Sequence, residues 1–178
     1  LINLIPRFYD ISSGSIRIDN VDVRRYDLKA LREKIGFIPQ KALLFTGSIN
    51  ENIRYGKHDA GKSEVEHSAK VAQAYDFITE PKQFEEMIEE GGGNVSGGQR
   101  QRLSIARAVV RKPDIYIFDD SFSALDFKTD ANLRKQLKYE TKDAITLIVA
   151  QRVTSIMDAT RIIVLNEGAV VGMGTHRE

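Results

Sequence analysis

Hydrophobic and polar positions change their period along the chain, and the changes predict short strands and helices in alternation. Between Ser15 and Val23, apolar and polar residues alternate around an Asp19-Asn20 turn, which is typical of a β hairpin with one buried face. A second hairpin is predicted near the end of the chain, where apolar strands at 161–165 and 170–172 flank the turn at 166–168.

Three short apolar runs predict the strands of a parallel sheet. They cover residues 36–38, 115–118 and 145–149, and the last two are hydrophobic enough to be buried on both faces. Helical patterns separate these runs, and strands that alternate with helices pair in parallel. Residues 1–8 are apolar at helical spacing and are predicted to be the tail of a helix. The sequence therefore predicts an α/β fold.

Capping residues and helical spacing predict four helices between these strands. Ser, Thr, Asp and Asn favour the first position of a helix because their side chains accept hydrogen bonds from its free N–H groups. The predicted helices begin after Asp27, at a capping box of Ser63 with Glu66, near Ser96, and near Phe127, where the pattern continues to Tyr139.

Length and charge fit one domain without a strong electrostatic partner. The chain has 178 residues, with 26 Lys and Arg against 25 Asp and Glu, so its net charge is only +1. This balance gives no one-sided basic surface for nucleic acid or an anionic membrane. Arg100, Arg102, Arg107 and Arg111 follow one helix toward its C-terminal end, where the dipole favours cations, and no aromatic stacking platform accompanies them. We therefore expect no nucleic-acid partner.

Composition also excludes several classes of site. The chain contains no Cys, so it has no disulfide, thiolate zinc site or cysteine nucleophile. Its apolar runs are far shorter than the roughly 20 residues of a membrane-spanning helix, so the chain itself is not expected to cross a bilayer. It begins with Leu1 and has no signal-peptide pattern, which suggests a fragment of a longer protein.

Ser96, Gly97, Gly98 and Gln99 open a predicted helix and form a candidate site for an anion. The first N–H groups of a helix have no partner within it, and the positive end of the helix dipole lies there. The two glycines let an anion approach the backbone without a clash. A glycine-rich loop with a serine cap and no ligand is the alternative.

Asp119 and Asp120 follow the buried run 115–118 and form a candidate site for Mg²⁺ on a nucleotide. In the Walker B arrangement, the carboxyl end of a buried strand carries such a carboxylate. An acidic residue in this place is also common as a helix cap, so the pattern alone does not decide between the two roles.

The order and spacing of the motifs resemble the nucleotide-binding domain of ATP-binding cassette (ABC) transporters over essentially all 178 residues. The resemblance implies a P-loop NTPase-type parallel sheet with an antiparallel hairpin region and a helical signature subdomain at about residues 49–111, truncated at the N-terminus. In the family's terms, Gln40 would be the Q-loop glutamine, 92–101 the signature motif, 115–120 the Walker B strand, 123–126 the D-loop, and Gln151 the residue at the switch-histidine position.

The resemblance also implies ATP with Mg²⁺ in a composite site, between two domains packed head to tail. Asp119 and Gln40 would be the metal ligands, Asp120 and Gln151 would occupy the catalytic positions, and Gln40, Ser96, Gly97, Gly98, Gln99 and Asp126 would contact the nucleotide or the dimer interface.

An exporter with these features implies two partners. One is a second nucleotide-binding domain, and the other is a transmembrane domain whose coupling helices would contact the segment 46–53. The implied function is to couple ATP binding and hydrolysis to transmembrane transport, at the cytoplasmic face of the cell membrane. ABC ATPases of chromosome organisation, repair or translation are the alternative. The segment between Gln40 and Ser96 lacks the sustained heptads of the long coiled coils in the first two classes.

Two departures from the family pattern predict an impaired site. Asp120 stands where active members carry the glutamate that polarises the attacking water, and Gln151 stands where they carry a histidine. A glutamine side chain can donate a hydrogen bond but cannot carry the positive charge of a protonated histidine. The pair resembles the degenerate half of heterodimeric ABC exporters, which binds ATP and barely cleaves it.

A third departure concerns the phosphate-binding loop. Members of the family carry a Walker A motif directly before a stretch that resembles residues 1–10, and this chain is expected to begin just past it. The segment 56–63 does satisfy G-x-x-x-x-G-K-S. A P-loop, however, requires a buried strand before the loop and a largely buried helix after it. Polar residues flank 56–63 on both sides, so we predict a surface loop without a phosphate role.

Overall fold

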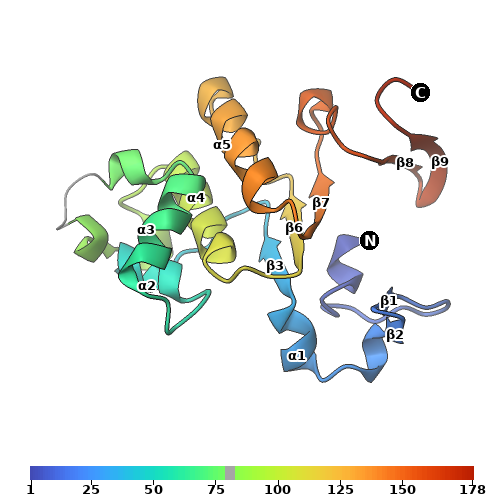
Figure 1. Ribbon diagram of the computed structural model, residues 1–178, viewed down its shortest axis with the longest axis horizontal. Coiled ribbons are helices and arrows are strands. Elements are labelled where there is room, and N and C mark those ends of the chain that lie inside the picture. Colours follow the sequence, from blue (N-terminus) through green and yellow to red (C-terminus); the bar gives the residue numbers. More distant parts are fainter. Residues whose placement is uncertain (79–82) are drawn as a thin grey trace.

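Three parallel strands form the centre of the molecule (Figure 1). The computed structural model describes residues 1–78 and 83–178, and β3 (Ile35–Ile38), β6 (Ile115–Asp119) and β7 (Ile145–Val149) lie in the order β3-β6-β7. The register pairs Ile38 with Phe118 and Asp119 with Val149, so the three carboxyl ends meet at one edge of the sheet. The predicted parallel sheet is confirmed.

The alternation of side chains along β6 divides the core between the two faces of the sheet. Tyr116 and Phe118 belong to the larger hydrophobic cluster, and Ile115 and Ile117 belong to a smaller one on the other face. The larger cluster is completed by α2 (Ile49–Arg54), α3 (Lys62–Val71), α4 (Gly97–Val109) and α5 (Phe127–Glu140), and the smaller one includes Leu31 of α1 (Leu28–Glu33).

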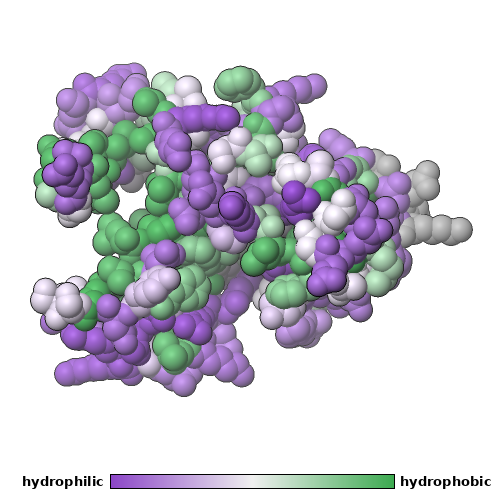
Figure 2. Space-filling view, turned by 180° about the vertical axis from the view of Figure 1, so that it is seen from behind, coloured by the Kyte–Doolittle hydropathy of each residue, from purple (hydrophilic) through white to green (hydrophobic). Residues whose placement is uncertain are grey.

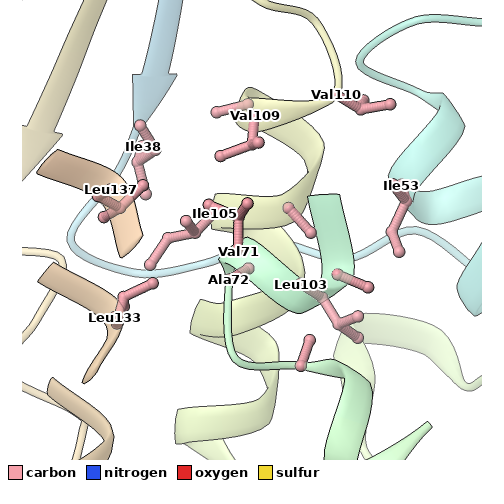
Figure 3. Close-up of a cluster of buried hydrophobic side chains, with 14 of the residues drawn as sticks. Ile38, Ile53, Val71, Ala72, Leu103, Ile105, Val109, Val110, Leu133 and Leu137 are labelled. Atoms are coloured by element: carbon pink, nitrogen blue, oxygen red, sulfur yellow. The ribbon is translucent and has the colours of Figure 1, made fainter. Parts of the chain in front are cut away.

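Helix α4 lies in the middle of the larger cluster. Figure 3 shows Leu133 and Leu137 of α5 on one side of α4 and Ile53 of α2 on the other. Since neighbours surround it, α4 buries residues on most of its circumference, unlike a surface helix with a single apolar stripe. Its buried residues are Gln101, Leu103, Ser104, Ile105, Ala106, Ala108 and Val109.

Strand β7 is less buried than its sequence predicts. Within the described residues it pairs only with β6, and its other edge has no neighbouring strand. Ile145 is therefore 60% exposed and Val149 40% exposed, so the prediction of a fully buried strand at 145–149 is wrong. Figure 2 shows hydrophobic residues along an open hollow between the C-terminal hairpin and the N-terminal part of the chain, where this edge lies.

Both predicted hairpins are present. β1 (Arg17–Ile18) and β2 (Val21–Asp22) pair around Asp19 and Asn20, whose φ values of 52° and 63° suit a tight hairpin turn. At the other end of the chain, β8 (Ile162–Asn166) and β9 (Ala169–Gly174) form an antiparallel pair. The remaining elements are the pair β4 (Gly47–Ser48) and β5 (Met87–Ile88) and the 3₁₀ turns Ile2–Leu4, Val23–Arg25, Tyr75–Phe77, Gln83–Glu85, Glu90–Gly92 and Val153–Ser155.

Two segments differ locally from the prediction. At the N-terminus only a 3₁₀ turn forms, at Ile2–Leu4, and Arg7 adopts a left-handed φ of 53° that ends any helical course. Helix α3 begins after Gly61, because Glu64 accepts a hydrogen bond from the Gly61 N–H at 2.9 Å, so the predicted capping box of Ser63 with Glu66 is wrong. No helix in the described part of the chain is long and apolar enough to cross a membrane.

Candidate functional site

Gln40 and Asp120 meet at the carboxyl edge of the sheet. Gln40 follows the end of β3 by two residues and Asp120 follows the end of β6 by one, and the parallel register brings both to the same level. The Nε2 group of Gln40 donates a hydrogen bond to Oδ2 of Asp120 over 3.3 Å. Asp119, the last residue of β6, is partly exposed beside them. The structure therefore brings together the amide and carboxylate groups that the sequence singled out.

The backbone of Asp120 is fixed in an uncommon conformation. Its φ of 46° lies in the left-handed region, which costs a non-glycine residue on the order of 1 kcal/mol. Asp120 N–H donates to the carbonyl oxygen of Val149 at 2.9 Å, and its own carbonyl accepts from Oγ of Ser123, also at 2.9 Å. Since strand β7 and the following turn both hold this residue, the direction of its side chain is set by the backbone.

Gln151 is exposed and follows β7 by two residues, at the same edge of the sheet. The next residue, Arg152, was not singled out from the sequence. Its Nη2 group donates to the carbonyl oxygen of Ser123 at 3.3 Å, and its guanidinium lies 5.7 Å from the centre of the Phe127 ring. Arg152 thus links the segment of Gln151 to the turn after β6, a contact that local sequence patterns do not reveal.

The N-terminus of α4 has a complete capping box. Oγ of Ser96 accepts from Gln99 N–H at 3.2 Å, and Oε1 of Gln99 accepts from Ser96 N–H at 2.8 Å. The serine hydroxyl and the Gln99 N–H are thus already paired. In the described part of the chain, the N–H groups of Gly97 and Gly98 have no acceptor. These two N–H groups, more than the hydroxyl, are the donors that remain available to an anion.

The start of α4 also touches the segment 123–126. A Cβ atom built on Gly98 would lie 3.3 Å from the Ala124 carbonyl oxygen. Asp126 caps α5, because its Oδ1 accepts from Thr129 N–H at 2.9 Å, and the same hydrogen bond holds the Asp126 pKa below its usual value. No hydrogen bond among the described residues joins Ser96–Gln99 directly to Gln40 or Asp119. The two candidate sites are thus separate on this chain.

The arginines of α4 bind backbone carbonyl groups of neighbouring segments, which the predicted dipole effect does not account for. Each guanidinium presents several N–H donors in a planar fork, so one side chain can satisfy more than one carbonyl. Nη1 of Arg100 donates to Gly92 O at 2.9 Å and Val95 O at 2.8 Å, Nη1 of Arg102 to Gln73 O at 2.8 Å, and Nη2 of Arg111 to Arg32 O at 2.7 Å.

The segment 56–63 has none of the surroundings of a phosphate-binding loop. Helix α2, not a strand, precedes it, and α3 follows it. The Gly61 N–H, which such a loop would offer to a phosphate, is bonded to the Glu64 carboxylate at 2.9 Å. Lys57 pairs with the same carboxylate over 2.7 Å, and its hydrogen bond lowers the Glu64 pKa. A negative charge of the protein therefore already occupies this loop.

Gly56 is explained by packing. A Cβ atom on this residue would lie 2.0 Å from the carbonyl oxygen of Arg107, so only glycine lets the loop approach the end of α4. Lys62, in the position of the P-loop lysine, has a side chain that is 87% exposed and lies 3.9 Å from Glu66. The match to the motif therefore comes from one close backbone approach and one surface lysine.

Substitution of Lys62 by alanine is expected to leave ATP binding by the full-length protein unchanged and its unfolding free energy within about 0.5 kcal/mol. Gly56→Ala, by contrast, is expected to destabilise the protein by about 1–3 kcal/mol, since the added methyl group overlaps a backbone oxygen. Chemical denaturation and nucleotide titration of both variants check this. A large loss of ATP affinity in Lys62→Ala would show that the loop does bind phosphate.

The residues at the carboxyl edge of the sheet suit Mg²⁺ chemically. This ion takes oxygen ligands, and proteins usually hold it by one or two carboxylates together with substrate phosphates. The partly exposed Asp119 carboxylate and the amide oxygen of Gln40 are donors of this kind. The described residues contain no cluster of three or more His, Cys, Asp or Glu, so these donors cannot form an all-protein cage. Such a site is complete only with ligands from a nucleotide.

The chain is similar to many known proteins along its whole length. It is 42% identical over 179 aligned positions to an uncharacterized ABC transporter ATP-binding protein of Mycobacterium tuberculosis, covering 99% of this chain and 31% of that protein. It is 44% identical to a putative multidrug export ATP-binding/permease protein of Staphylococcus aureus, covering 100% of this chain and 31% of that protein. The chain thus spans about a third of the length of these relatives.

A solved structure gives the same picture at the level of the fold. The structure of a bacterial Atm1-family ABC exporter with ATP bound superposes with a TM-score of 0.95 at 36% identity, covering 99% of this chain and 31% of that one. The α/β fold with its parallel sheet, hairpins and helices therefore matches an ABC exporter. The family model described as ABC transporter matches residues 1–123, which include Gln40, the start of α4 and the acidic end of β6, and the chain belongs to the ABC transporter family.

Proposed function

We propose that this chain is the ATP-binding domain of an ABC exporter and forms two half-sites, each completed by a second nucleotide-binding domain. The observation that carries the proposal is the hydrogen bond from Gln40 to Asp120 at the carboxyl edge of the sheet, at a place separate from the free N–H groups of Gly97 and Gly98. A chain with one metal-binding edge and one anion-binding helix start, held apart, suits a head-to-tail pair of domains.

The half-site at the sheet edge belongs to this chain's own nucleotide. Asp119 and Gln40 would hold Mg²⁺, which when bound neutralises charge on the phosphates. Asp120 is placed to orient the attacking water through its carboxylate, and Gln151 to donate a hydrogen bond toward the γ-phosphate. Aspartate is one methylene shorter than glutamate, which withdraws the carboxylate by ~1.5 Å, and displacements of about 1 Å can cost on the order of 10²-fold in rate. This half-site is therefore the slow one.

The half-site at α4 serves the nucleotide of the other domain. Ser96 and Gln99 hold each other in the capping box, and this leaves the N–H groups of Gly97 and Gly98 to face the phosphates. Asp126 lies at the same end, where it caps α5. Because this half-site is intact while the sheet edge carries two departures, we propose that the partner is a different domain, in a heterodimer. The predicted boundary 49–111 of the helical subdomain stays a prediction and includes 79–82, which lie outside the described residues.

The membrane partner is proposed from the relatives and from one exposed surface. A relative in Staphylococcus aureus is named an export ATP-binding/permease protein, which joins an ATP-binding part to a permease. Here Leu43, Phe45 and Tyr55 are exposed beside the segment 46–53. We propose that the coupling helices of a transmembrane domain contact this surface, which places the chain at the cytoplasmic face of the membrane.

Purified full-length protein with its partner tests the proposal. In lipid vesicles, ATP hydrolysis and nucleotide-dependent transport should require both nucleotide-binding domains and Mg²⁺. Removal of the partner should abolish hydrolysis, because neither half-site is complete alone. Steady hydrolysis by a lone monomer, at the rate of the assembled protein, would exclude the composite site.

The isolated chain of residues 1–178 is expected to have negligible affinity for Mg-ATP. The backbone and lysine of a P-loop hold the β- and γ-phosphates in this family, and the one sequence match, at 56–63, is a surface loop with a carboxylate bound in it. Isothermal titration calorimetry checks this, with the full-length protein as the positive control. Saturable binding at micromolar concentrations would contradict the expectation.

A further inference from the structure

Arg107, in the last turn of α4, has no carboxylate partner among the described residues. Its three donating nitrogens instead bind oxygen atoms of two segments that are far away in the sequence. Nε donates to Asn52 O at 2.8 Å, Nη1 to Leu43 O at 2.9 Å, and Nη2 to Asn52 Oδ1 at 2.8 Å. Burial lowers the Arg107 pKa to about 10, so the guanidinium is still charged at neutral pH. Its charge is balanced only by carbonyl dipoles and aromatic faces.

Two aromatic rings cover the guanidinium. The Arg107 carbon Cζ lies 5.1 Å from the ring centre of Phe45 and 5.6 Å from that of Tyr55, and the two rings lie 4.4 Å apart. Cation–π contacts of this length are attractive and strengthen when water is excluded. Arg107 therefore fixes the rings as well as the backbone of the segment that carries Phe45.

Asn52, which is 2% exposed, completes the same network from α2. Its Nδ2 donates to Phe45 O at 2.8 Å and to Ser48 O at 3.1 Å, and its Oδ1 accepts from Phe45 N–H at 2.9 Å. Between them, Arg107 and Asn52 bind the carbonyl groups of Leu43, Phe45 and Ser48. The segment 43–48 is thus held by two side chains rather than by regular secondary structure.

The held segment presents apolar side chains outward. Leu43 is 69% exposed, Phe45 47% and Tyr55 55%, although the backbone beneath them is bonded to a buried network. An exposed surface on a fixed backbone suits a binding site, since less ordering is needed when the partner docks.

We infer that Arg107, together with Asn52, is a positioning residue that ties the surface of Leu43, Phe45 and Tyr55 to helix α4. The inference rests on the proposed function, in which this surface meets the transmembrane domain. Gly97 and Arg107 lie on one continuous helix, about 15 Å apart at 1.5 Å per residue. A shift of α4 on nucleotide binding at its start is therefore transmitted directly to the docking surface at its end.

A spin label on full-length protein tests this positioning role. The chain has no Cys, so Thr46→Cys introduces a single labelling site in it, on an exposed residue within the held segment. With the full-length protein in lipid vesicles, we expect an immobilised spectrum that changes when Mg-ATP is added. Arg107→Lys keeps the charge but loses the planar fork. It is expected to abolish the immobilised component and the response to Mg-ATP.

Arg111→Lys is the matched control. Arg111 is in the turn after α4 and also donates only to backbone oxygens, but these belong to Glu33 and Arg32. It should leave the label spectrum unchanged. Equal spectra for the two variants would overturn the inference. If Arg107→Lys does not fold, Asn52→Asp, which cannot donate to Phe45 O or Ser48 O, must mobilise the label, and an immobile label would again overturn it. ATP hydrolysis by the unsubstituted protein with its partner tests the proposed function separately.

Discussion

Asp120→Glu combined with Gln151→His is expected to raise ATP hydrolysis at this chain's own half-site by about 10²-fold in the assembled protein. The longer side chain moves the carboxylate by ~1.5 Å toward the position from which it can polarise water, a displacement on the scale that governs near-attack geometry. The backbone of Asp120 is held by Val149 and Ser123, so the added methylene extends the side chain without moving its origin. Histidine at position 151 adds a group that can carry a positive charge near the γ-phosphate.

Phosphate release with the partner's own site inactivated measures this half-site alone. Asp120→Asn with Gln151→His is the matched control and should show no rise, because an amide cannot accept a proton from water at neutral pH. An unchanged rate for the Asp120→Glu variant would argue against an impaired half-site in this chain.

Gly97→Asp is expected to reduce hydrolysis at the partner's nucleotide by about 10²–10³-fold, the usual loss when one donor to a developing anion is removed. A carboxylate at the start of α4 would occupy the place of the phosphates and repel them. The closest protein atom to a Cβ built at this position is Nη2 of Arg100, at 3.9 Å, so the substitution meets open space and should not disturb the fold.

Gly97→Asn is the matched control because it has the same size without the charge, and it should retain far more activity than Gly97→Asp. Melting temperatures of both variants test whether the fold is intact. Equal losses in the two variants would mean that the position is sensitive to bulk alone, and the anion-binding role of α4 would be unsupported.

The sequence was informative where local chemistry decides the structure. The buried run 115–118 with its acidic end, the Ser96 capping box and both hairpins follow from patterns of a few residues, and the structure contains all of them. The meeting of Gln40 with Asp120 was also foreseeable, because parallel strands bring their carboxyl ends to one edge.

Features that depend on distant neighbours were not predictable in this way. The run 145–149 is as hydrophobic as a buried strand, but its exposure depends on whether another strand lies beside it. Arg107 reaches oxygens 55 and 64 residues away, and no local pattern marks those partners. The start of α3 was misplaced because Gly61 and Ser63 are both acceptable caps, and Glu64 decides between them through Gly61 N–H.

The free edge of β7 makes the isolated polypeptide a template for strand addition. Its outward N–H and C=O groups stand in one row beside exposed apolar side chains, and a strand from a neighbouring molecule can bond to this row at the usual spacing of about 4.8 Å. Pairing of this kind grows with concentration and does not require a specific sequence in the added strand. Intermolecular β assembly, rather than unfolding, is then the process that limits how concentrated a solution of residues 1–178 can be.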